Sequence, residues 1–176
     1  MAKAVNVYLI GPRACGKTTL GRKLAAALKR PFVDTDRRIR LATGKTVAEI
    51  VEAGGWEAFR EAESDALGEV AVFSGQVVSC GGGIVLRQEN REILARGVVL
   101  YLTAPVEVLA ERLLRNPENA QRPSLTGAAI ADEVRQVLAE RGPLYKELAH
   151  AELSSEQPLA ALVEQSLVVV KRLERR

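Results

Sequence analysis

The sequence is poor in cysteine and histidine, which narrows the chemistry it can support. Cys15 and Cys80 are its two cysteines, and they lack the paired spacing of a metal site. Two cysteines are also too few for a disulfide framework, so we expect reduced thiols. The single histidine, His150, stands at the start of a weak predicted strand, and we expect it to be structural or exposed.

Long apolar runs and an excess of one charge are missing as well. No apolar stretch approaches the ~18 residues of a membrane span, and no signal peptide precedes the first predicted strand, so we expect a cytoplasmic protein with no membrane partner. A net charge of +3 is too small for a nucleic-acid footprint. We therefore expect a small-molecule partner. Separately, we expect a monomer. Without repeats or low-complexity tracts, residues 1–176 are predicted to form one domain.

A phosphate-binding motif is the strongest signal present. Residues 11–18 read Gly-Pro-Arg-Ala-Cys-Gly-Lys-Thr, which fits Gly-x-x-x-x-Gly-Lys-[Ser/Thr], and they lie between an apolar run and a predicted helix. Such a loop gathers backbone N–H groups around phosphates at a helix N-terminus. The motif predicts a nucleoside triphosphate site. Within it, Cys15 is expected to be an exposed, reactive thiol beside Lys17.

Short strands alternate with helices along the rest of the chain, which predicts an α/β fold with a parallel sheet. We expect a three-layer α/β/α arrangement with five strands. The predicted strands are Val5–Ile10, Phe32–Asp34, Gln76–Cys80, Val98–Leu102 and His150–Leu153. The predicted helices are Lys17–Lys29, Asp36–Ala42, Thr46–Ala53, Trp56–Ala71, Gln88–Arg96, Pro105–Arg115, Ala128–Leu148 and Pro158–Leu173, and Thr46 and Glu49 form a predicted capping box.

Two acidic residues follow the second predicted strand. Because ligands bind at the carboxyl ends of parallel strands, Gly11, Asp34 and Gly81 should converge on one edge of the sheet. There Thr18 is expected to bind Mg²⁺, with one or both of Asp34 and Asp36 close to the metal. Helix capping is the competing role for either aspartate.

The remaining candidates are weaker when each is taken alone. Arg60 and Glu63 have the spacing of a routine surface ion pair. The triple glycine at residues 81–83 follows an apolar strand and suits either anion binding or a flexible turn. Residues 116–127 contain two prolines and Arg122, and they form a candidate mobile lid. Arg141 alone reads as a surface residue.

Taken in order, these motifs resemble the shikimate kinase family, especially its enterobacterial type II form. The resemblance covers nearly the whole chain and includes the phosphate loop, Phe-Val-Asp-Thr-Asp, Phe59-Arg60 with Glu63, the triple glycine, Arg122-Pro-Ser-Leu-Thr-Gly and Arg141 with Pro-Leu-Tyr. It implies a P-loop kinase fold in which ATP phosphorylates the 3-hydroxyl of shikimate, within the biosynthesis of chorismate and aromatic amino acids. It also implies a shikimate-binding region near residues 35–62 and a lid near residues 114–128.

The resemblance also implies a role for individual residues. Lys17, Asp36 and Arg122 would be catalytic, Thr18 and Asp34 would hold Mg²⁺, and Glu63 would orient Arg60. Arg112 and Pro158 would contact the adenine of ATP. The full set of ATP contacts would be Gly11, Ala14, Cys15, Gly16, Lys17, Thr18, Thr19, Arg112, Arg122 and Pro158. Shikimate would contact Asp36, Arg60, Gly81, Gly82, Gly83 and Arg141.

The phosphate loop departs from the family pattern at one position, and two alternative functions are considered. Ala14 stands where the family often has glycine, which would cost about 1 kcal/mol if the loop needs a left-handed residue there. The first alternative is a gluconate kinase, because gluconate is also a hydroxylated carboxylic acid. A GTP-dependent switch or non-catalytic nucleotide-binding module would explain Asp65-x-x-Gly68, but that motif lies in a predicted helix and the sequence has no Asn-Lys-x-Asp.

Overall fold

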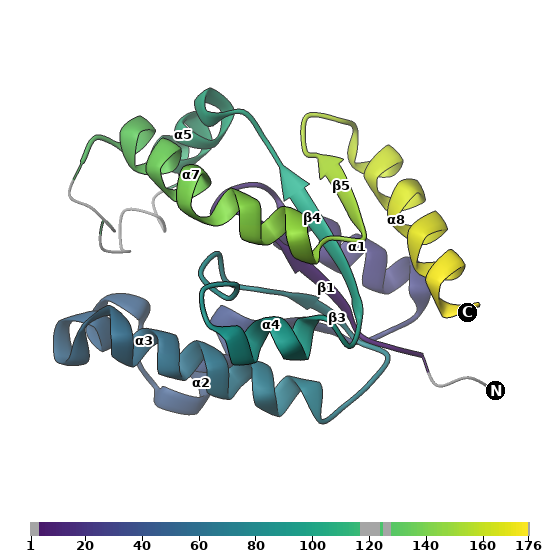
Figure 1. The fold of residues 1–176 in the computed structure, drawn as a ribbon, viewed down its shortest axis with the longest axis horizontal. Coiled ribbons are helices and arrows are strands. Elements are labelled where there is room, and N and C mark those ends of the chain that lie inside the picture. Colours follow the sequence, from purple (N-terminus) through teal and green to yellow (C-terminus); the bar gives the residue numbers. More distant parts are fainter. Residues whose placement is uncertain (1–3, 117–123, 125–127, 176) are drawn as a thin grey trace.

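The computed structural model describes residues 4–116, 124 and 128–175. A parallel five-stranded sheet in the order β2-β3-β1-β4-β5 forms the centre of the molecule (Figure 1). The strands are β1 (Val7–Ile10), β2 (Phe32–Asp34), β3 (Val77–Ser79), β4 (Val98–Thr103) and β5 (Ala151–Ser154).

Helices cover both faces of this sheet, so the expected three-layer α/β/α fold is confirmed. In Figure 1, α4 and α7 lie in front of the sheet, α1 lies behind it, and α8 flanks β5. The helices are α1 (Lys17–Leu28), α2 (Thr35–Thr43), α3 (Val47–Ala71), α4 (Gln88–Leu94), α5 (Val106–Arg115), α7 (Ile130–Leu148) and α8 (Leu159–Glu174). None of them, over the described ranges, is long and apolar enough to cross a membrane.

The alternation of side chains along β1 divides the core into two halves. Val7 and Leu9 pack with buried residues of α1 and α8, whereas Tyr8 and Ile10 pack with α3, α4 and α7. Successive residues of a strand point to opposite faces, so a nearly continuous apolar strand is what a sheet covered on both faces requires. The central strand is thereby fixed in register, and the loop that follows it is fixed as well.

The long helix α3 is interrupted at Gly55, whose φ of 72° and ψ of −178° are not helical. The break lies where the sequence predicted two separate helices, and glycine accepts this backbone at little steric cost. The capping box of Thr46 and Glu49 opens α3 as predicted. Beyond the kink, Phe59 packs with Ile39 of α2 in a small third cluster, which holds the second half of α3 beside the sheet edge.

The predicted elements are all present, with ends that differ by one or two residues. The first strand begins at Val7 instead of Val5, and α7 begins at Ile130 instead of Ala128. Such shifts are ordinary because helix and strand ends fray.

Candidate active site

The phosphate loop runs from the end of β1 to the start of α1, and its backbone explains its glycines. Gly11 has a φ of 140°, and a Cβ there would lie 2.5 Å from the Leu102 carbonyl oxygen, so glycine is required. Ala14 is left-handed, with a φ of 62°. The condition for strain at this position is therefore met, at a cost of about 1 kcal/mol.

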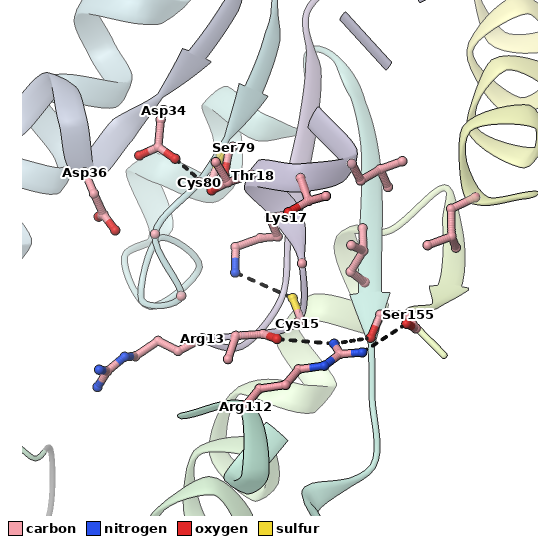
Figure 2. Close-up of a pocket in the computed structure, with 18 of the residues that line it drawn as sticks. Arg13, Cys15, Lys17, Thr18, Asp34, Asp36, Ser79, Cys80, Arg112 and Ser155 are labelled. Carbon is pink, nitrogen blue, oxygen red and sulfur yellow. Dashed lines mark hydrogen bonds between the residues drawn. The ribbon is translucent and has the colours of Figure 1, made fainter. Parts of the chain in front are cut away.

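The side chain of Lys17 is folded back over the loop. Its ammonium donates to the carbonyl oxygens of Gly11 at 2.9 Å and Pro12 at 2.7 Å, and it lies 3.6 Å from the Cys15 sulfur (Figure 2). The expectation of an exposed Cys15 thiol is wrong, because this residue is 0% exposed. Its side chain packs under the loop with the core residues, where the close approach of Gly11 leaves space for it. Both cysteines are free and buried.

Three oxygen-bearing side chains meet beside the loop. The Thr18 hydroxyl donates to Asp34 Oδ2 at 3.0 Å and lies 3.4 Å from the Ser79 hydroxyl (Figure 2). Asp34 also caps α2, since its Oδ1 accepts from the Arg37 N–H at 3.2 Å. The two roles considered for Asp34 are thus compatible. Ser79 was not predicted, although its place at the end of β3, directly before Cys80 and the triple glycine, is a signal for it.

The donor set at this point fits Mg²⁺. Carboxylate and hydroxyl oxygens are the hard ligands that the ion prefers, and Mg²⁺ is usually held by one or two carboxylates together with phosphates of the substrate. Among the described residues there is no cluster of three or more His, Cys, Asp or Glu side chains that could hold a metal. The sparse set formed by Thr18 and Asp34 suits an ion that arrives with a nucleotide.

A cavity of about 520 Å³ extends from the phosphate loop in two directions. At one end it reaches Asp34, Asp36 and Ser79; at the other it reaches Arg112, Ser155 and the first residues of α8. Its described lining includes most of the predicted nucleotide contacts, namely Ala14, Cys15, Gly16, Lys17, Thr18, Thr19 and Arg112. Pro158 is exposed at the N-terminus of α8, between the lining residues Gln157 and Leu159.

A second, smaller hollow of about 30 Å³ adjoins the first. Asp36, Gly81 and Gly82 line both hollows, which places them where the two meet. The remaining lining gathers residues from α3, the triple glycine and α7, among them Arg60, Glu63, Gly83 and Arg141. The structure therefore brings every predicted acceptor contact to one place. Arg13 lines both hollows too and was not predicted, although it lies within the phosphate motif.

Arg60 and Glu63 form a buried ion pair, which differs from the surface pair that their spacing alone suggests. Glu63 is 1% exposed, and its carboxylate accepts from the Arg60 guanidinium. Burial raises the pKa of Glu63, and the nearby Arg60 opposes this rise. The Arg60 guanidinium also lies over the Phe59 ring at 5.4 Å and the Trp56 ring at 5.6 Å. These contacts on several sides give Arg60 a defined position in the smaller hollow.

The carbonyl oxygen of Gly82 is held from the side of α7. Arg141 donates to it at 3.3 Å, and the Tyr145 hydroxyl donates to it as well. Both residues are buried, and Tyr145 packs against the Tyr101 ring with centroids 5.0 Å apart. Burial raises the pKa of Tyr145, so its hydroxyl keeps the proton that it donates. The role of Tyr145 was missed, although it lies four residues after Arg141 on the same helical face.

Three further predictions concern other parts of the chain. Arg122 and most of the predicted lid fall outside the described residues. His150 is exposed and structural, since its Nδ1 accepts from the Val99 N–H at 3.1 Å. Asp65 and Gly68 lie inside α3, where they cannot form the loop that a GTP-dependent switch would need.

Comparison with known proteins agrees with this geometry. The shikimate kinase family model matches residues 13–171. A shikimate kinase from Nitratidesulfovibrio vulgaris is 51% identical over 164 residues, covering 93% of this chain and 94% of that protein. Shikimate kinase 2 from an Enterobacter species is 50% identical over 152 residues, covering 86% and 87%. The structure of a shikimate kinase from Acinetobacter baumannii in complex with shikimate is 36% identical, with a TM-score of 0.90, covering 99% and 97%.

Proposed function

The chain belongs to the shikimate kinase family, and we propose that it performs this kinase activity by transferring the γ-phosphoryl group of ATP to the 3-hydroxyl of shikimate between the two adjoining hollows. The observation that carries the proposal is the position of Asp36 and Gly82, which line both hollows. One hollow contains the phosphate loop, and the other contains Arg60 and Arg141. The shared boundary is where a donor phosphate and an acceptor hydroxyl would meet.

The smaller hollow suits the carboxylate of shikimate. Arg60 and Arg141 supply two guanidinium groups, each able to form charge-assisted hydrogen bonds with a carboxylate. Arg141 is 6% exposed, and its Nε has no hydrogen-bond partner among the described residues. A buried charged donor without a full set of partners is costly unless a ligand supplies one. This supports a bound anion at Arg141.

Asp36 is proposed to bind the acceptor hydroxyls. It lies in the first turn of α2, at the boundary of the hollows, so its carboxylate can accept from a hydroxyl that faces the phosphate loop. Phosphoryl transfer has a loose transition state with little early demand for proton removal. The main contribution of Asp36 is therefore to orient the acceptor hydroxyl. Asp36 accepts the proton of that hydroxyl later in the reaction.

Lys17 is proposed to exchange its loop contacts for phosphate contacts. Its ammonium already spans the carbonyls of Gly11 and Pro12, so it would turn toward the β and γ phosphates when ATP enters the cavity. Thr18 and Asp34 would hold Mg²⁺, which when bound neutralises charge on the phosphate oxygens. The loop N–H groups complete the charge stabilisation.

The remaining proposals concern the whole protein. The described strands form one sheet, which supports a single domain. We also propose a monomer. Free, buried thiols at Cys15 and Cys80 support a cytoplasmic location, because disulfides are rare there. The family places the reaction within aromatic amino acid biosynthesis. Membership of this family favours shikimate over gluconate as the acceptor, and an enzyme over a nucleotide-dependent switch.

The experiment that tests the proposal measures ADP release with shikimate, gluconate and nucleoside monophosphates in parallel. We expect turnover with shikimate and at least about a hundredfold lower kcat/KM with the others, because those molecules would not place an anion at the two arginines and a hydroxyl at Asp36 at the same time. In the same assay, Arg141→Ala should have a shikimate KM about 10–100-fold higher than that of the unaltered protein. Arg141→Lys should have a KM nearly as high, because lysine lacks the planar fork of arginine. Unchanged shikimate dependence in both variants would reject the carboxylate contact.

A further inference from the structure

Arg112 makes contacts that its expected role at the adenine does not account for. It extends from α5, and its Nη1 donates to the Ala14 carbonyl at 3.3 Å and to the Ser155 hydroxyl at 2.9 Å. Its Nη2 donates to the Ser155 carbonyl at 3.2 Å. Figure 2 shows the guanidinium lying between the phosphate loop and Ser155. One side chain thus joins α5, the phosphate loop and the segment between β5 and α8.

The residue that Arg112 contacts in the loop is the strained one. Ala14 and Lys29 are the described non-glycine residues with positive φ, and Ala14 is the one inside the phosphate loop. A left-handed alanine persists only where its surroundings hold it. The contact from Arg112 is charge-assisted, which makes it one of the stronger kinds of hydrogen bond that a carbonyl can accept.

Holding this carbonyl also fixes a phosphate ligand. In a planar trans peptide the C=O and the following N–H point in opposite directions. The orientation of the Ala14 carbonyl therefore sets that of the Cys15 N–H, one of the loop amides expected to bind ATP. Ser155 in turn fixes the guanidinium from the far side, through two of its oxygens.

We propose that Arg112 is a positioning residue for the phosphate loop, which keeps the left-handed Ala14 peptide in the conformation that binds phosphate. This inference rests on the proposed function of the loop and goes beyond a contact with the base. It also accounts for the tolerance of alanine at position 14, since a contact from another helix offsets the conformational cost that glycine would avoid.

The test uses a ligand that has phosphates but no base. Binding of magnesium tripolyphosphate to the full chain is measured by calorimetry for the unaltered protein, Arg112→Met and Arg112→Lys. We expect about a tenfold weaker affinity for both variants, because lysine keeps the charge but cannot join Ala14 to Ser155 as the planar fork does. Arg135→Met, a change of equal charge at an exposed residue of α7 that pairs with Asp132, should bind as the unaltered protein does.

A double-mutant cycle separates positioning from direct attraction. In the Ala14→Gly background the loop adopts the left-handed conformation without a Cβ, so Arg112→Met should weaken tripolyphosphate binding by less than about threefold. Ser155→Ala, which removes one anchor of the guanidinium, should weaken binding by about threefold in the Ala14 background. Melting temperatures of all variants verify that they are folded.

The proposal is overturned if Arg112→Met binds tripolyphosphate normally, if Arg112→Lys fully restores binding, or if the loss is the same with alanine and glycine at position 14. The first result would show that Arg112 acts only through a contact with the adenine base. The second would show that its effect depends on positive charge alone. Shikimate-dependent ADP release by the unaltered enzyme is measured separately. Because tripolyphosphate binding needs no acceptor, failure of the proposed function and failure of this inference remain distinguishable.

Discussion

The Tyr145 hydroxyl donates a hydrogen bond to the Gly82 carbonyl, the same oxygen that Arg141 reaches at 3.3 Å. Both donors come from one face of α7, and the carbonyl belongs to the loop after β3. Since a peptide is planar, the orientation of this carbonyl also sets that of the Gly83 N–H. Tyr145 therefore links the helix that supplies Arg141 to the backbone that borders the proposed acceptor site.

Tyr145→Phe should raise the KM for shikimate by about 3–10-fold, the effect of one lost hydrogen bond, and leave the KM for ATP unchanged. The ring and its packing against Tyr101 remain, so the fold is preserved. Steady-state kinetics with each substrate varied in turn provide the measurement. Tyr101→Phe is the matched control and should change neither constant. An equal rise in both KM values for Tyr145→Phe would contradict a specific effect at the acceptor site.

The glycines at positions 82 and 83 should respond differently to alanine. A Cβ on Gly83 would lie 1.7 Å from the Arg60 guanidinium, whereas a Cβ on Gly82 would meet nothing closer than 3.5 Å. Arg60 is flexible enough to move, so Gly83→Ala should displace it and raise the shikimate KM by at least about tenfold while the protein stays folded. Gly82→Ala should raise it by less than about threefold. The reverse order of effects would show that Arg60 is not needed where the structure places it.

Asp36→Asn should lower kcat by more than the ~10²–10⁴-fold assignable to general-base catalysis, because orientation of the acceptor is lost too. Asp34→Asn serves as a contrast, since Asp34 lies beside Thr18 and the proposed metal. Its activity should depend more steeply on Mg²⁺ concentration and recover in part at high Mg²⁺. Rates measured over a Mg²⁺ series distinguish the two variants. Near-normal activity of Asp36→Asn would refute its proposed role.

The stability of the protein should depend on pH through Glu63. Burial raises the pKa of Glu63 above its ordinary value of 4.5 in the folded state, so the folded protein holds this proton more tightly than the unfolded chain. The resulting stabilisation is fully present below 4.5 and is lost as the pH rises through the raised pKa. Relative to Glu63→Gln, the free energy of unfolding should fall with pH in that window, by at most about 1.4 kcal/mol per pH unit.

Urea unfolding at a series of pH values above 4.5 measures this difference. Glu61→Gln, at an exposed position of the same helix, is the control and should follow the unaltered protein. Parallel pH curves for the unaltered protein and Glu63→Gln would show that Glu63 is not the group responsible.

Most of the fold and the nucleotide-binding part of the site could be predicted from local sequence patterns. The phosphate motif spans eight consecutive residues, so its strand, loop and helix could be read directly from the sequence. The start of α3 and its break at Gly55 were predictable for the same reason, since a capping box and a glycine pair are local signals. Convergence of Asp34 and Gly81 at one sheet edge followed from the parallel topology alone.

Contacts between distant segments were not accessible in this way. Arg112 and Ala14 are 98 residues apart in the sequence, and Tyr145 and Gly82 are 63 apart. Their approach depends on how helices pack on the sheet, which periodicity does not specify. Glu63 shows the same limit, because its spacing from Arg60 is identical for a surface pair and for the buried one that the structure contains. Burial decides the difference, and it is a property of the folded chain.

Because Cys15 is buried, its thiol can be used as a reporter of movements of the phosphate loop. A reagent can alkylate a fully buried sulfur only from conformations in which the loop has opened, so the labelling rate reports the population of those conformations. Cys80→Ala removes the other thiol and leaves a single reporter. Ligands that close the loop would then slow labelling in proportion to their occupancy, which gives a direct measure of loop opening that requires no turnover.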